Sequence, residues 1–104
     1  MTYAGSLYRH GDVLIAPIAA LPAGSVARAG LILAHGEHTG HTHRIRETGA
    51  ASLYVYGKEL YLVVLADTAT VVHEEHRPIE LPVGVYRVWQ QREYTPSAIR
   101  TVVD

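Results

Sequence analysis

Histidines are concentrated in two short segments of this chain. Four of the seven histidines lie within nine residues, and they are His35, His38, His41 and His43. Two more bracket a pair of acidic residues in the segment His73-Glu74-Glu75-His76. Imidazole is the commonest transition-metal ligand and the usual acid–base group near neutral pH. The two segments therefore predict one histidine-built site that is assembled from separate parts of the chain.

The spacing of the first segment suits metal binding on a strand. Residues two apart share a face of a β-strand, so His41 and His43 point the same way, and Glu47 keeps that parity if the strand continues. Two imidazoles on one face supply half of the ligands of a transition-metal site. The remaining ligands are expected from the second segment, where the candidates are His73, Glu75 and His76. Nitrogen and oxygen ligands suit Zn, Fe, Mn, Ni or Cu, and the sequence does not choose among them.

The second segment can contribute two imidazoles only if the chain bends. His73 and His76 are three residues apart, so a flat strand would direct them to opposite faces. The dipeptide Arg77-Pro78 favours a bend directly after them, because the residue before a proline is restricted to extended or turn conformations. His38 has the wrong parity to join the first pair, and a bulge at Gly40 would correct it.

Composition limits the class of protein. The chain has no cysteine, which excludes disulfides, thiolate zinc sites and iron–sulfur clusters. A net charge of −1 argues against generic nucleic-acid binding, which needs a basic excess. The longest apolar run, residues 13–23, carries two prolines and is too short to span a membrane as a helix, and no leader pattern is seen. We therefore expect one soluble, cytoplasmic domain over residues 1–104, without a membrane partner.

Short apolar and aromatic runs separated by turn residues predict an all-β fold. Residues 52–56 and 59–66 are joined by Gly57-Lys58, which fits a β-hairpin with a type II′ turn. Turns are also expected at His10-Gly11-Asp12, with His10 as an ordinary polar residue, and at the two Leu-Pro-x-Gly segments, 21–24 and 81–84. Further strands are predicted at residues 13–16, 30–34, 70–73, 79–81, 85–89 and 99–103, and a short helical turn at 95–97. Seven or eight short antiparallel strands would form a small barrel or sandwich.

Two segments resemble the motifs of the cupin family. His41-Thr-His43-Arg-Ile-Arg-Glu47 is similar to the first motif, in which His-x-His is followed by a glutamate. Pro82-Val-Gly84-Val-Tyr-Arg87 is similar to the second, Pro-x-Gly-x-x-His, with Arg87 in place of the histidine ligand. The resemblance implies a cupin-like β-barrel, often a homodimer, with His41, His43 and Glu47 as candidate ligands. Either His73 or His76 would then replace the missing ligand, or Arg87 would mark a site for an anion.

The whole chain also resembles a set of short bacterial and phage proteins. The shared framework comprises Gly11-Asp12-Val13-Leu14, Thr39-Gly40-His41-x-His43-Arg44-Ile45, His73-Glu-Glu-His76-x-Pro78-Ile79 and Gln91-Arg92-Glu93-Tyr94. This resemblance supports the extent of the domain and implies no activity.

Three functions remain open on these residues. The first is binding of a divalent transition metal, with metal-dependent catalysis as an extension. In that extension Glu47 or Glu75 would be the general base, and Arg44 or Arg87 would hold an anionic group. The second is a metal-free histidine–arginine site that binds or acts on a phosphodiester or another anion. The third is a binding or assembly module without chemistry, in which exposed strand edges pair subunits.

Overall fold

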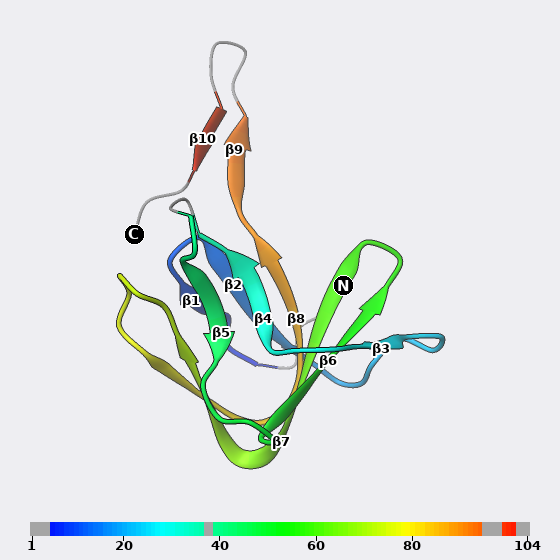
Figure 1. The fold of residues 1–104 in the computed structure, drawn as a ribbon. Coiled ribbons are helices and arrows are strands. Elements are labelled where there is room, and N and C mark those ends of the chain that lie inside the picture. Colours follow the sequence, from blue (N-terminus) through cyan, green and yellow to red (C-terminus); the bar gives the residue numbers. More distant parts are fainter. Residues whose placement is uncertain (1–4, 37–38, 95–98, 102–104) are drawn as a thin grey trace.

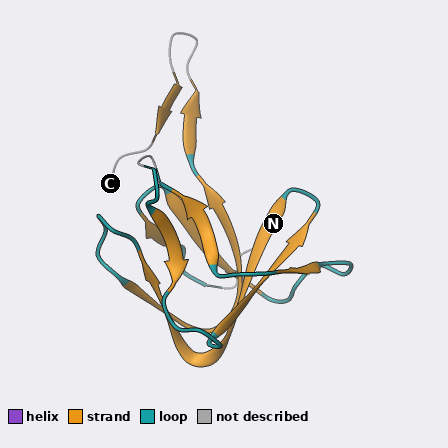
Figure 2. Ribbon diagram, viewed as in Figure 1, coloured by secondary structure: helices purple, strands orange, loops and turns teal. Residues whose placement is uncertain are grey.

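The computed structural model describes residues 5–36, 39–94 and 99–101, and these residues form strands and turns without a helix (Figure 1, Figure 2). The strands are β1 (Tyr8–His10), β2 (Val13–Ile18), β3 (Val26–Arg28), β4 (Ile32–His35), β5 (Thr42–Ile45), β6 (Ala51–Tyr56), β7 (Glu59–Val72), β8 (Ile79–Gln90), β9 (Arg92–Tyr94) and β10 (Ile99–Thr101). The first eight belong to one antiparallel sheet, which confirms the all-β prediction. The described part of the chain contains no helix that is long and apolar enough to cross a membrane.

Two long strands form the centre of the main sheet. β7 and β8 pair with each other, and β2 and then β1 continue the sheet beyond β8. On its other edge, β7 pairs with β6 along its first half and with β5 near its end. β3 then pairs with β6, and β4 pairs with β5. In the described residues the hydrogen-bonded order runs from β1 to β4 without joining these two, so the sheet is curled but not closed into a barrel.

β7 and β8 bend at the same level of the sheet. Their register shifts between Val64 and Thr68, which lie opposite Gly84 and Pro82 of β8. Proline cannot donate to a ladder and glycine tolerates unusual backbone geometry, so both residues suit an irregular strand pair. The two strands sweep through the lowest part of the view in Figure 1. The predicted break between residues 66 and 70 and the predicted turn at 81–84 are therefore wrong, because both segments are bends within continuous strands.

Two hairpins begin their turns with glycine. Between β6 and β7, Gly57 has a φ of 61° and Lys58 has a negative φ, which confirms the predicted type II′ geometry. Between β1 and β2, Gly11 has a φ of 62° in a two-residue turn of the same kind. The sequence did not predict β1 itself, because residues 8–10 have no alternation of apolar and polar side chains.

Three further local predictions have different outcomes. The turn expected at residues 21–24 lies one residue later, where the Ser25 amide donates to the Pro22 carbonyl. The last predicted strand corresponds to β10, which pairs with β9 and not with the main sheet. The short helical turn expected at residues 95–97 lies outside the described residues.

The hydrophobic core lies inside the curl of the main sheet. Its members come from strands on both sides of the bend, and the most deeply buried include Ile15, Leu53, Leu62, Val71, Leu81 and Tyr86. Along β6 buried and more exposed residues alternate, as expected for a strand with one face on the core. The removal of this apolar surface from water stabilises the curled shape. The curl brings the β1–β2 turn close to β5 and to the chain that follows β7.

Candidate metal centre

Strand register places two of the predicted ligands side by side. β5 pairs with β7 up to Arg44 opposite Val72, so the next positions along the two chains are those of His43 and His73. β7 ends at Val72, and an irregular connection leads from there to β8. The predicted bend is therefore present, and it turns His73 and His76 toward the same side.

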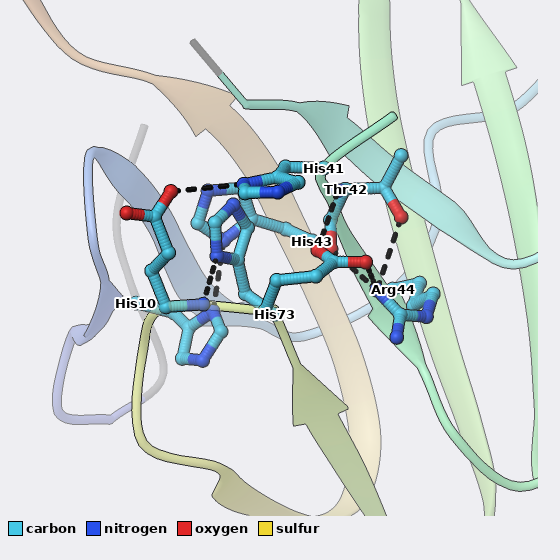
Figure 3. A network of polar contacts seen from close by, with 8 residues as sticks. His10, His41, Thr42, His43, Arg44 and His73 are labelled. Atoms are coloured by element: carbon cyan, nitrogen blue, oxygen red, sulfur yellow. Dashed lines mark hydrogen bonds and ion pairs between the residues drawn. The ribbon is translucent and has the colours of Figure 1, made fainter. Parts of the chain in front are cut away.

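Three imidazoles form the candidate metal centre, and Figure 3 shows two of them, those of His43 and His73. One ring nitrogen from each of His43, His73 and His76 lies within 4.8 Å of the other two. The ring centroids are 4.4 Å apart for His43 and His73, and 4.7 Å apart for His73 and His76. His43 is buried at 1% exposure, and His73 is half-buried. A set of three converging nitrogens is typical of the protein ligands of a first-row divalent ion.

The inner imidazoles are held in the neutral form. The pKa of His43 is lowered from 6.5 to about 3, first by burial and then by the neighbouring rings of His73, His10 and His76. Burial likewise lowers the pKa of His73. A neutral imidazole keeps a lone pair for a metal ion, whereas imidazolium has none. At neutral pH these two rings can therefore bind an ion without first losing a charge.

His73 has a hydrogen bond that an ion would change. Its Nδ1 accepts the backbone N–H of Glu75 at 2.9 Å, so the hydrogen of the neutral ring is on Nε2. Binding of an ion through Nε2 requires this hydrogen to move to Nδ1 and the Glu75 amide to turn away. We therefore expect a local rearrangement of the connection between β7 and β8 on metal binding.

A second, more exposed ligand group shares His73 with the first. Ligand atoms of His41, His73 and Glu74 lie within 4.8 Å of one another. His41 Nδ1 is 2.9 Å from Glu75 Oε1, and Glu74 accepts hydrogen bonds at 3.1 Å from the Thr42 amide and from the Arg44 guanidinium. The structure therefore brings the predicted residues His41, Glu75 and Arg44 to the outer side of the cluster. It adds Glu74, which the sequence did not single out.

Two residues of the β1–β2 hairpin also reach the cluster. His10 is 2% exposed, and its Nδ1 lies 2.8 Å from Nδ1 of His43. Asp12 Oδ1 lies 3.5 Å from Nε2 of His43. His10 is a hydrogen-bonded polar residue, as the sequence predicted, and the structure adds that one of its partners belongs to the cluster. The local sequence shows only a turn at this point, and the proximity to His43 depends on contacts between residues more than thirty positions apart.

Glu47 and Arg87 bond to residues outside both ligand groups. The two carboxylate oxygens of Glu47 accept hydrogen bonds from the amide and the hydroxyl of Thr70, at 2.8 Å and 2.6 Å. Arg87 pairs with Glu59 at 3.0 Å, and its guanidinium lies 5.0 Å from the ring centroid of Trp89. His38 lies outside the described residues, so its part in the site stays a prediction.

Comparison with known proteins identifies one related family. The model of a domain of unknown function (DUF8820) matches residues 9–91, a range that includes both histidine segments and the β1–β2 turn. No curated protein matches the chain, and no solved structure matches it. The resemblance to cupins stays a prediction.

Replacing Gly11 by alanine is expected to disturb both the turn and the metal centre. A Cβ atom at Gly11 would lie 2.8 Å from Nε2 of His76 and 3.0 Å from Cε1 of His43. A positive φ also costs a residue with a Cβ about 1–2 kcal/mol. Gly57→Ala is the matched control, because Gly57 has nearly the same φ and a Cβ there meets nothing within 4 Å among the described residues.

Thermal melting should show that both glycine variants are less stable than the wild type. Metal titration should show weaker binding for Gly11→Ala and unchanged binding for Gly57→Ala. Equal affinities of the two variants would contradict the close packing of the β1–β2 turn against the histidines.

Replacing Glu47 by glutamine is expected to destabilise the protein at neutral pH and much less in acid. Hydrogen bonds from the Thr70 hydroxyl and then from its amide lower the pKa of Glu47 from 4.5 to about 2. A lowered carboxyl pKa contributes stability that is complete above about pH 4.5 and is lost as the pH falls toward 2.

The difference in melting temperature between wild type and Glu47→Gln should therefore be constant from pH 7 to pH 5 and shrink below that. Glu80→Gln, which changes an exposed glutamate on β8, is the control and should differ little from the wild type. A difference for Glu47→Gln that stays the same down to pH 2.5 would show that its bonds to Thr70 do not depend on charge.

Proposed function

The chain belongs to the DUF8820 family, whose function is unknown, and we propose that it binds one divalent transition-metal ion through His43, His73 and His76. The observation that carries this proposal is the convergence of three imidazoles from β5 and from the connection after β7 within 4.8 Å. Imidazoles packed this closely repel one another when protonated, so the cluster favours neutral rings, whose lone pairs are available to an ion. The lowered pKa values of His43 and His73 support metal binding.

The chemistry of the ligands limits which ions the centre would bind. Imidazole nitrogens with carboxylates nearby suit Zn, Fe, Mn, Ni or Cu in their divalent states. Calcium and magnesium prefer all-oxygen sites, which three histidines cannot supply. The absence of cysteine disfavours ions that select thiolates.

Binding of an ion would join parts of the chain that are far apart in sequence. His43 belongs to β5, whereas His73 and His76 belong to the irregular connection between β7 and β8. A ligand that binds the folded state alone stabilises it by about 4 kcal/mol at 1,000 times its dissociation constant. We therefore expect the metal to raise the melting temperature and to order the connection.

Removal of one ligand tests the proposal directly. Elemental analysis of untagged wild-type protein should find about one first-row ion per chain. Alternatively, protein from which metal has been removed by a chelator should take up one ion per chain on titration. His76→Ala should weaken binding by about 100-fold or more and abolish the metal-dependent rise in melting temperature.

His35→Ala is the control for this experiment. His35 is an exposed histidine on β4 that belongs to neither ligand group, so its removal should leave metal binding unchanged. In the wild type, the amide resonance of Glu75 should move on metal addition, because His73 must release that amide. A wild-type protein that takes up no metal would overturn the proposal.

Metal-dependent catalysis is the second candidate, and the His41–Glu75 pair favours it. The two side chains are 30% and 52% exposed and 2.9 Å apart, and His41 shares a ligand group with His73. A carboxylate paired with an imidazole at the solvent side of a metal site can take up and release a proton. A bound ion would supply charge stabilisation for a hydrolytic or hydration reaction.

Glu75→Gln separates catalysis from binding. The variant should keep its metal, because Glu75 belongs to neither group of candidate ligands, and it should lose turnover of any hydrolytic substrate found by screening. Loss of metal instead would assign Glu75 to the metal centre. The metal-free anion site has less support, because Arg44 and Arg87 are already paired with Glu74 and Glu59.

A further inference from the structure

Four polar groups lie in a row that includes His43 of the metal centre. The carbonyl oxygen of Arg77 lies 2.9 Å from Nε2 of His10, and Nδ1 of His10 lies 2.8 Å from Nδ1 of His43. The far nitrogen of His43, Nε2, faces Oδ1 of Asp12 at 3.5 Å. Both ends of the row, the carbonyl and the carboxylate, can only accept hydrogen bonds.

With both imidazoles neutral, hydrogens fill only two of the three contacts that join these four groups. A contact between two lone pairs is favourable only when a hydrogen or another positive centre lies between them. Two neutral imidazoles supply only two hydrogens. The Arg77 carbonyl takes the hydrogen on Nε2 of His10, so Nδ1 of His10 accepts and Nδ1 of His43 donates. The lone pair on Nε2 of His43 is then left facing the carboxylate of Asp12.

The length of this last link fits a metal ion better than a proton. A hydrogen bond between imidazolium and carboxylate is about 2.7–2.9 Å long, whereas the distance from His43 to Asp12 is 3.5 Å. Two ligands that are each about 2.1 Å from a tetrahedrally coordinated ion lie about 3.4 Å apart. The separation of these two acceptors therefore corresponds to the edge of a coordination tetrahedron.

Asp12 is also held in place as a ligand would be. Its other carboxylate oxygen, Oδ2, accepts a hydrogen bond from the Gln90 side chain at 3.2 Å, and its backbone carbonyl accepts the Gln91 amide at 2.8 Å. The side chain is 13% exposed. Hydrogen bonds of this kind orient the ligands of metal sites and are typical of their surroundings.

We infer that Asp12 becomes the fourth ligand of the metal centre when an ion binds, and this inference rests on the proposed function. The Asp12 carboxylate faces His43 and lies outside the group of nitrogens within 4.8 Å, so the β1–β2 turn and the connection after β7 would draw together on binding. The ion would then have three imidazoles and one carboxylate, supplied by the β1–β2 turn, β5 and the connection after β7. The carboxylate offsets part of the charge of a divalent ion, which three neutral imidazoles do not. Gln90 and His10 are positioning residues, the first for Asp12 and the second for His43.

Titration with Co²⁺ of protein from which metal has been removed by a chelator tests the inference. The visible absorption of bound Co²⁺ reports the number and type of its ligands. Wild-type protein should bind one equivalent with the intense bands of a four-coordinate site. Asp12→Asn should bind about 100-fold more weakly with a changed spectrum, and Gln90→Ala about 10-fold more weakly with a similar one. Asp67→Asn, which changes an exposed aspartate at the bend of β7, is the control and should match the wild type.

The two proposals fail in different ways. Wild-type protein that binds no Co²⁺ or Zn²⁺ would overturn both. Binding by Asp12→Asn with unchanged affinity and spectrum would overturn the role of Asp12 and leave the three-histidine centre intact. If Asp12→Asn does not fold, the side-chain carboxyl ¹³C resonance of Asp12 in wild-type protein decides. It should shift when Zn²⁺ is added, and an unmoved resonance beside shifted histidine signals would overturn the inference.

Discussion

The paired bend of β7 and β8 is the constraint on which the rest of the structure depends. Each strand pairs with its partner on both sides of the bend, through pairs such as Leu62 with Tyr86 and Ala69 with Leu81. These four side chains are almost completely buried, so the bend is stabilised by the apolar surface that it encloses. β5 pairs with the end of β7, and the β1–β2 turn is attached to β8 because β2 pairs with β8. The bend therefore also brings β5 close to the β1–β2 turn. Without the bend, His43 and Asp12 would lie on separate parts of an open sheet.

The candidate metal centre contains a contact between two acceptors, Nε2 of His43 and Oδ1 of Asp12. Buried imidazoles must remain neutral, and each ring nitrogen then either donates or accepts but not both. The row from Arg77 to Asp12 ends in two acceptors, so it contains one more lone pair than hydrogens can fill. A bound cation, as proposed above, would remove this mismatch. The cluster lies in a domain whose remaining interior is almost entirely apolar.

The charged groups around the cluster fall into two sets: one set joins strands of the sheet, and the other lies next to the histidines. Glu47 joins the loop after β5 to Thr70 of β7, and the Arg87–Glu59 pair joins β8 to β7. These contacts stabilise the sheet at a distance from the histidines. Glu74 and Glu75 instead lie at the solvent side of the cluster, where they contact Arg44 and His41. Their position makes them the carboxylates that can respond to a bound ion or to a substrate.

The sequence by itself determined the fold class, the hairpin at Gly57-Lys58 and the two segments that would meet in a histidine site. These features depend on local chemistry, namely strand periodicity, the positive φ that glycine allows, and the concentration of imidazoles. Tertiary structure alone decided that Glu47 bonds to Thr70, that residues 81–84 bend within a strand, and that His10 and Asp12 join the cluster. Each of these outcomes depends on contacts between residues that are distant in the chain, and such contacts leave no pattern in the sequence around either partner.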